Sequence, residues 1–153
     1  MKKIVYVDMD NVLVDFPSGI ARLSDEDRIK YDGKYDECPG IFSLMDPMPD
    51  AVESFRTLSQ YFSTYILSTS PWLNPRAAMH KVEWVHKHFG SGKDSPAYKR
   101  LILSHHKNLN KGHFLIDDRD KNGVLEFEGE HIHFGQTPFF GWREVMKYSI
   151  PKA

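Results

Sequence analysis

The sequence predicts a doubly wound α/β fold, with a mainly parallel, five-stranded, Rossmann-like sheet and a small helical cap inserted after the first strand. Short apolar runs alternate with amphipathic helical patterns along the chain. One connection, residues 16–49, is much longer than the others. Strands that alternate with helices favour a parallel sheet. We expect one domain over 1–153, with its core in 1–15 and 50–153 and the cap in about 16–49.

The five predicted strands are short and apolar. The first, Ile4 to Val7, is β-branched and aromatic and has no polar interruption. That pattern is typical of a strand buried on both faces of a parallel sheet. The other predicted strands cover residues 65–67, 100–103, 114–116 and 132–134.

Helical patterns fill most of the intervening sequence. Asp50 and Glu53 form a possible capping box before a helix that extends to about residue 62. Asn74 and Pro75 precede an amphipathic stretch over 76–89, and a weaker helix is expected over 139–148.

The long connection begins with a predicted helix from Pro17 to Leu23, which Asp15 can cap. A charged stretch over 24–34 and a turn-rich segment follow. Long insertions in compact domains are often functional, so we interpret 16–49 as a small lid over the site.

Composition limits the partners and the location. Lys and Arg number 20 against 21 for Asp and Glu, which argues against nucleic acid or a membrane surface as a partner. The single cysteine, Cys38, cannot form an internal disulfide, which favours a reducing compartment. Asp8 ends the only apolar run near the N-terminus, and no window has the roughly 20 apolar residues of a membrane span. We expect a cytoplasmic protein.

Polar residues follow three of the predicted strands directly: Asp8 and Asp10, then Thr69 and Ser70, then Asp117 and Asp118. The carboxyl ends of parallel strands line one crevice, so these segments should converge. Four carboxylates in one place repel one another unless a cation lies among them. Oxygen ligands without Cys or His favour Mg²⁺.

This grouping predicts phosphoryl chemistry. Asp8 can act as a nucleophile, and Asp10 as the general acid and base for the leaving oxygen and for water. Lys107, ten residues before Asp117, can bind the phosphoryl oxygens together with Thr69 and Ser70. Taken singly, each of these residues also has an ordinary explanation as a turn residue or a solvated lysine.

With these residues in view, the chain resembles the haloacid dehalogenase (HAD) superfamily of phosphatases. Residues 8–15 (DMDNVLVD) resemble its first motif, Thr69 and Ser70 its second, Lys107 its third, and 117–118 its fourth. The nearer resemblance is to the 5'(3')-deoxyribonucleotidases, the cytosolic and mitochondrial pyrimidine nucleotidase family. It rests on residues 8–16, 42–52, 68–71, 82–90 and 103–119.

The resemblance implies that Mg²⁺ is held by the carboxylate of Asp8, the backbone carbonyl of Asp10 and the carboxylate of Asp118. Asp117 would be an alternative ligand, or would lie behind the ligands and orient Lys107. The resemblance also implies that Phe16 packs near a nucleobase. Phe42 is either part of the lid core or a substrate contact, and Trp72 could border the pocket. His105 occupies a position where arginine is common in that family.

The leading hypothesis is therefore a magnesium-dependent phosphate-monoester hydrolase that forms a phosphoaspartate and acts on (deoxy)nucleoside monophosphates. One alternative is a phosphatase or phosphotransferase for another small phosphorylated metabolite. A catalytically idle HAD-like binding protein is another. A signalling receiver domain fits poorly, because it needs an aspartate where the central strand ends in Leu67, Ser68 and Thr69.

Overall fold

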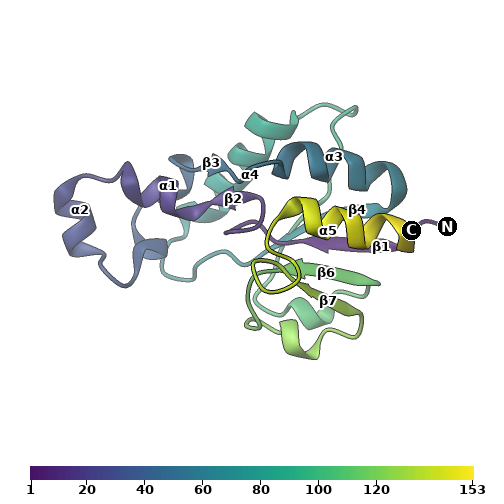
Figure 1. Ribbon diagram of the computed structural model, residues 1–153. Helices are drawn as coiled ribbons and strands as arrows, with labels where there is room; N and C mark the ends of the chain where they lie inside the picture. The colour runs from purple at the N-terminus through teal and green to yellow at the C-terminus, as the bar shows by residue number, and fades with distance from the viewer.

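The computed structural model describes residues 1–153 and contains one five-stranded sheet in the order β5-β4-β1-β6-β7 (Figure 1). Every neighbouring pair in this sheet is parallel. The five predicted strands are confirmed, with boundaries that differ by no more than two residues. They are β1 Ile4–Val7, β4 Ser63–Ser68, β5 Leu101–Leu103, β6 Phe114–Asp117 and β7 Glu130–His133.

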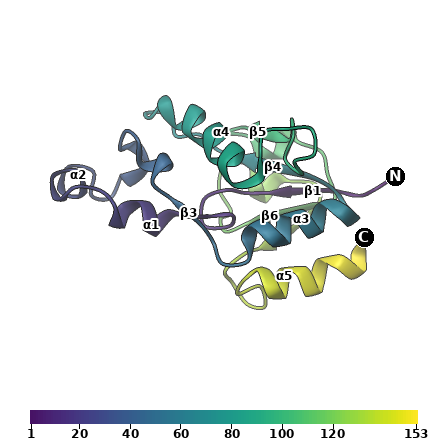
Figure 2. The same cartoon turned by 90° about the horizontal axis from the view of Figure 1, so that it is seen from above.

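The two faces of the sheet are covered differently. Val5 and Val7 of β1 belong to a cluster of 27 buried residues that includes side chains of α3 (Ala51–Tyr61), α4 (Arg76–Phe89) and α5 (Trp142–Ser149). These three helices lie together on one face (Figure 2). Tyr6 points to the opposite face and into a cluster of only five buried residues.

That second face is covered by short 3₁₀ helices, η3 (Lys107–Leu109) and η4 (Val124–Glu126). The strand order is doubly wound as predicted, since β4 and β5 lie on one side of β1 and β6 and β7 on the other. The connections that cross the second face, 104–113 and 118–129, are too short to cover it with full helices.

Two expectations about helix ends were wrong. Asp50 has a left-handed backbone (φ 64°) and its side chain makes no capping hydrogen bond, so the capping box with Glu53 does not form. The last helix begins at Trp142, three residues later than expected. Trp142 itself is buried, and its Nε1 donates a hydrogen bond to the carbonyl of Val12, 2.8 Å away.

The insertion after the first strand starts with β2 (Val14–Asp15), which pairs with β3 (Asp46–Pro47) to form an antiparallel stem. Between them lie α1 (Phe16–Ala21), α2 (Asp25–Lys30), η1 (Tyr35–Glu37) and η2 (Ile41–Ser43). Asp15 caps α1 as predicted, because its Oδ1 accepts a hydrogen bond from Ser18 N at 3.2 Å. In Figure 1, α2 lies at the far end of this segment from the sheet.

The sequence did not predict α2. Ser24 caps this helix, but none of its residues is buried, so no apolar periodicity marks it.

The second half of the insertion is attached to α4. Asn74 Nδ2, just before the helix, donates to the carbonyls of Asp36 and Cys38 at 3.0 and 3.1 Å. Trp84 Nε1 donates to the carbonyl of Met45 at 2.9 Å. Cys38 is a buried free cysteine. The insertion therefore reaches the sheet through α4 as well as through its own stem.

No helix in the structure has the length and apolar character required to cross a lipid bilayer.

Candidate active site

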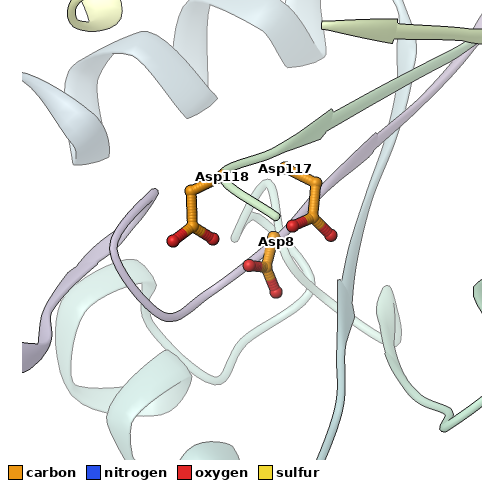
Figure 3. Close-up of side chains that lie close together, drawn as sticks. All are labelled: Asp8, Asp117 and Asp118. Atoms are coloured by element: carbon orange, nitrogen blue, oxygen red, sulfur yellow. The ribbon is translucent and has the colours of Figure 1, made fainter. Parts of the chain in front are cut away.

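Three acidic side chains meet where β1 and β6 end. Asp8 follows β1 and its N–H donates to the carbonyl of Ile116 at 2.9 Å, which continues the pairing of the two strands. Asp117 ends β6 and Asp118 follows it. Each of the three contributes an oxygen that lies within 4.8 Å of the others (Figure 3). The predicted convergence of the first and last segments is thus present.

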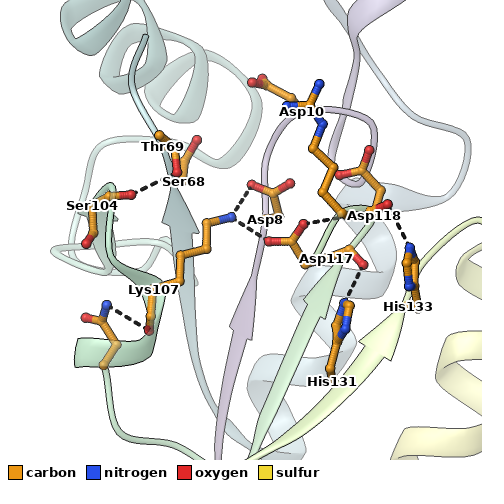
Figure 4. Close-up of polar contacts among 12 residues, drawn as sticks. Asp8, Asp10, Ser68, Thr69, Ser104, Lys107, Asp117, Asp118, His131 and His133 are labelled. Carbon is orange, nitrogen blue, oxygen red and sulfur yellow. Dashed lines mark hydrogen bonds and ion pairs between the residues drawn. The ribbon is translucent and has the colours of Figure 1, made fainter. Parts of the chain in front are cut away.

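Lys107 supplies the positive charge of this cluster. Its Nζ donates to Asp8 Oδ1 at 2.9 Å and to Asp117 Oδ2 at 2.5 Å, and the residue is buried (Figure 4). Burial works against the ammonium, but the two carboxylates outweigh it and raise the pKa of Lys107. The lysine is therefore a fixed cation, and not a solvated surface side chain.

A close approach of two loops positions Lys107. Its N–H donates to the carbonyl of Asn122 at 2.7 Å. Next to it, Gly123 has φ +86°, and a Cβ at that position would clash with Asn108 Oδ1 and lie 2.9 Å from Lys107 N. Only glycine satisfies both the backbone angle and the lack of space.

The two neighbouring aspartates differ in their partners. Asp117 uses both oxygens, since Oδ1 accepts from Arg119 N at 2.9 Å and Oδ2 accepts from Lys107. Asp118 Oδ1 is buried and has no hydrogen-bond partner. Burial first, and then the charge of Asp8, raises the pKa of both carboxyl groups. Lys107 contacts only two of the three acids, Asp8 and Asp117. The third, Asp118, has one buried oxygen without a partner, and this arrangement fits a divalent cation that prefers oxygen ligands.

Two histidines on β7 hold the backbone of these aspartates. Nε2 of His131 donates to the carbonyl of Asp117 at 3.0 Å, and Nε2 of His133 donates to that of Asp118 at 2.9 Å (Figure 4). Sequence reasoning gave them no role. The alternation of β7 could have indicated them, because residues two apart on a strand point to the same face.

Asp10 lies apart from the Asp8 cluster and has a different cation. Nζ of Lys81 lies 3.2 Å from both Asp10 Oδ1 and Oδ2, and 2.8 Å from Ser68 Oγ. Burial raises the pKa of Asp10, the positive charge of Lys81 opposes this shift, and the charge of Asp8 adds to it. A raised pKa favours the protonated form that a general acid needs.

The sequence analysis missed Lys81. It lies on the buried stripe of α4, among Ala77, Trp84 and Val85. A lysine at helical spacing within that stripe was the signal that could have identified it.

Comparison with known proteins settles the family. Residues 26–140 match the model of the family described as "5' nucleotidase, deoxy (Pyrimidine), cytosolic type C protein". A candidate 5'(3')-deoxyribonucleotidase of Vibrio phage KVP40 is 58% identical over 147 residues, which cover 96% of this chain and 84% of the relative. The chain belongs to this nucleotidase family. It is therefore a phosphomonoester hydrolase of the HAD superfamily, as the resemblance implied.

Two more distant relatives of the nucleotidase are also named as 5'(3')-deoxyribonucleotidases. The human cytosolic-type 5'(3')-deoxyribonucleotidase is 29% identical, with 85% of this chain and 78% of the relative covered. The mouse mitochondrial 5'(3')-deoxyribonucleotidase is 31% identical, with coverage of 85% and 71%. A haloacid dehalogenase-like hydrolase from Streptococcus pneumoniae has a TM-score of 0.51 over 96% of this chain and 90% of its own, at 15% identity. That last likeness supports the fold.

The predicted phosphate-binding pair of the nucleotidase is divided. Thr69 borders the cavity, and its Oγ1 donates to the carbonyl of Ser104 at 2.8 Å. Ser70 is half-buried, does not line the cavity and makes no side-chain hydrogen bond.

A cavity of about 540 Å³ opens over the acidic cluster of the nucleotidase. Phe16 and Tyr35 line it from the insertion, and Trp72 with His105 line it from the sheet side, their rings 6.0 Å apart. Phe42 is buried and does not line the cavity; its ring packs against Phe16 at 5.8 Å. The remaining wall includes basic and polar side chains that the sequence did not single out as ligands: Asn11, Arg119, Lys121 and Asn122.

Proposed function

We propose that this nucleotidase is magnesium-dependent, hydrolyses (deoxy)nucleoside 5'- or 3'-monophosphates, and forms a phosphoaspartate on Asp8. The observation that carries the proposal is the pairing of buried Asp8 with Lys107 at the edge of a cavity, beside two more carboxylates. The substrate class rests on the names of the relatives from Vibrio phage KVP40, human and mouse.

Mg²⁺ would be held by the carboxylates of Asp8 and Asp118 and by the backbone carbonyl of Asp10. The unpartnered oxygen of Asp118 supports this choice, because a buried carboxylate oxygen without a donor fits a cation. Asp117 has both oxygens occupied, which supports its role in orienting Lys107. When bound, Mg²⁺ supplies positive charge beside the phosphoryl oxygens and holds the substrate in line.

In the first step, a carboxylate oxygen of Asp8 attacks phosphorus, and the bond from phosphorus to the nucleoside oxygen breaks. Asp10 gives its proton to that leaving oxygen, so the nucleoside departs as a neutral alcohol. Lys107 stabilises negative charge on Asp8 and on the transferring phosphoryl group. Thr69 and Ser70 stay predicted phosphate ligands. The Thr69 hydroxyl would have to exchange its hydrogen bond to the carbonyl of Ser104 for one to the phosphoryl group.

In the second step, the Asp10 carboxylate takes a proton from water as the water oxygen attacks the phosphoaspartate. The bond from phosphorus to Asp8 breaks, inorganic phosphate leaves, and both aspartates return to their starting states. One residue thus serves as the acid in the first step and the base in the second.

The substrate would enter with its phosphate toward Asp8 and its nucleoside toward the aromatic wall. Phe16 and Tyr35 offer ring faces for a base, whereas Phe42 supports Phe16 from behind. Arg119 and Lys121 add positive charge to the wall of the cavity. We expect the protein to act in the cytoplasm, which agrees with the buried free thiol of Cys38.

Phosphate release from a panel of monophosphates tests the proposal. The panel contains ribo- and deoxyribonucleoside 5'- and 3'-monophosphates, sugar phosphates and 4-nitrophenyl phosphate, each with Mg²⁺ and with chelator. We expect Mg²⁺-dependent release, highest with deoxynucleotides, and a loss of more than about 10³-fold in Asp8→Asn. Trapping with a fluoroberyllate mimic should place beryllium on Asp8.

Other outcomes would redirect the assignment. Faster release from sugar phosphates would favour a different small metabolite as substrate. Full activity in Asp8→Asn, or attachment of the mimic to Asp10, would overturn the proposed roles. No release from any ester would favour a binding protein without activity.

A further inference from the structure

Lys81 is a charged side chain in the interior of the molecule. Its side chain is 0% exposed, and it occupies the inward stripe of α4 between Ala77 and Trp84. An isolated ammonium in such a place is costly, so its neighbours must compensate for the charge.

Its neighbours come from three separate parts of the chain. Nζ contacts the carboxylate of Asp10 after β1 and the hydroxyl of Ser68 at the end of β4, and lies 4.5 Å from the ring centre of Phe42 in the insertion. Asp10 is the only carboxylate within ion-pair distance. The charge of Lys81 is therefore directed at a single catalytic group.

Lys81 contacts the two oxygens of Asp10 symmetrically. Lys81 lies 3.2 Å from each oxygen of Asp10 and is the only residue with which that carboxylate forms a side-chain hydrogen bond. A symmetric contact with both oxygens fixes the position of the carboxylate and its rotation. Removal of Lys81 would leave Asp10 with no partner to hold it.

We infer that Lys81 is the positioning residue for proton transfer: it holds the Asp10 carboxyl group where it can protonate the leaving oxygen and later receive a proton from water. This inference rests on the proposed function, since it assumes the role of Asp10 in that reaction. Lys81 does not line the cavity, so it acts through Asp10 and not by contact with substrate.

Stability alone does not account for a lysine at this position. A buried ion pair is often no more stabilising than apolar side chains of similar volume, and the surrounding stripe of α4 is apolar. Methionine would fill a similar volume. What methionine cannot provide is the contact with both Asp10 oxygens.

The same ammonium connects Asp10 to the wall of the cavity. Phe42, whose ring faces Lys81, packs edge-to-face on Phe16, and Phe16 lines the cavity. Lys81 thus contacts Asp10 directly and supports the aromatic wall of the cavity through Phe42. The nucleoside end of the substrate and its leaving oxygen would therefore both be positioned relative to Lys81.

The experiment uses leaving groups that differ in their need for a proton. The alkoxide of a nucleoside is a poor leaving group unless its oxygen is protonated, whereas 4-nitrophenolate leaves readily without an acid. Rapid-quench measurements on the full chain with Mg²⁺ would give the rate of the first burst of product from 4-nitrophenyl phosphate and from a deoxynucleoside 5'-monophosphate. Lys81→Met is compared with Lys87→Met, the same change at an exposed position of α4.

We expect Lys81→Met to slow the nucleotide burst by about 10- to 100-fold, while the aryl-phosphate burst stays within about threefold of the wild type. The steady-state phase after the aryl burst should slow, because Asp10 must still activate water, and phosphoenzyme should accumulate. Lys87→Met should match the wild type in both bursts. The double variant Asp10→Asn, Lys81→Met should be no slower on nucleotide than Asp10→Asn alone.

Equal slowing of both bursts in Lys81→Met, or no slowing of either, would overturn the inference. If Lys81→Met does not fold, Ser68→Ala decides, because it removes one of the contacts that orient Nζ; its ratio of nucleotide to aryl burst rates should fall by a few fold. A wild-type protein that shows no burst and no phosphoenzyme would instead contradict the proposed function.

Discussion

The molecule has two buried lysines, and each pairs with one aspartate of the first motif. Lys107 comes from a 3₁₀ turn beside the sheet and bridges Asp8 and Asp117. Lys81 comes from the middle of α4 and bonds Asp10 alone among the carboxylates. The proposed nucleophile, Asp8, and the proposed proton donor, Asp10, thus have separate cations on separate elements. If these roles are correct, substitutions of the two lysines should alter phosphoryl transfer and proton transfer independently.

The largest effect on the burst rates should follow loss of Lys107, the cation beside Asp8. Lys107→Met removes the charge beside both Asp8 and the phosphoryl group, so burst rates should fall by about 10³-fold, about 4 kcal/mol of transition-state stabilisation. In contrast to Lys81→Met, the loss should be similar for 4-nitrophenyl phosphate and for nucleotide. Rapid-quench kinetics on both substrates measure it.

Lys111→Met, an exposed lysine four residues later, is the matched control. A Lys107→Met variant that lost only nucleotide turnover would remove the distinction between the two lysines.

A smaller effect should follow a change in the loop that supports Lys107. In Gly123→Ala the new Cβ meets Asn108 and the backbone of Lys107 at φ +86°, which should cost about 2–3 kcal/mol of unfolding free energy. Because this change should displace Lys107 and leave Lys81 in place, the burst rates with 4-nitrophenyl phosphate and with nucleotide should fall by the same factor. Urea unfolding and the burst assay together measure it.

Gly135→Ala provides the comparison, since Gly135 has a similar φ of +88° and no atom near the added Cβ. It should cost about 1 kcal/mol from backbone strain alone. Equal destabilisation by the two changes would show that the close approach at Lys107 has no energetic role.

The smallest effect concerns pH and metal. Burial and the charge of Asp8 raise the pKa of Asp118 to about 8. The folded state then holds this proton more tightly than the unfolded chain, so with chelator the Asp118 contribution to stability is present at low pH and is lost as pH rises from about 4 to about 8. Mg²⁺ should take the place of the proton, and it should raise Tm by a few degrees at pH 8 and by less at pH 6.

Thermal unfolding across this pH range, with and without Mg²⁺, measures the effect. Asp118→Asn should reduce the dependence on both pH and metal, whereas Lys81→Met should keep it, because Lys81 contacts no member of the acidic cluster. A metal effect that persisted unchanged in Asp118→Asn would place the ion elsewhere.

The strands and their order were predictable because buried parallel strands leave uninterrupted apolar runs such as Ile4–Val7. Local signals were less reliable. Asp50 has the side chain of a helix cap but a left-handed backbone, and its side chain makes no capping hydrogen bond. Helix α2 buries nothing, so it leaves no periodic pattern.

The candidate site was predictable where chemistry coincides with a strand end, as for Asp8, Asp117 and Asp118. Lys107 could be found through its spacing to Asp117. Lys81 could not be assigned to Asp10 from spacing, because 71 residues separate them and only the packing of α4 against the first loop brings them together. Trp72 could be placed beside the pocket from its position just after the second motif, whereas Arg119 reaches the cavity through loop geometry, which periodicity does not encode.

Helix α2 contrasts with everything around the site, because none of its residues is buried and it extends away from the sheet (Figure 1). The bonds from Asn74 to the carbonyls of Asp36 and Cys38 hold the chain in place just after it. An exposed segment followed by residues that are held by such hydrogen bonds can change in length without disturbing the residues that come after them. Residues 25–30 are therefore the place where a longer arm, a tag or an added binding element could be inserted into this enzyme without moving the proposed catalytic groups.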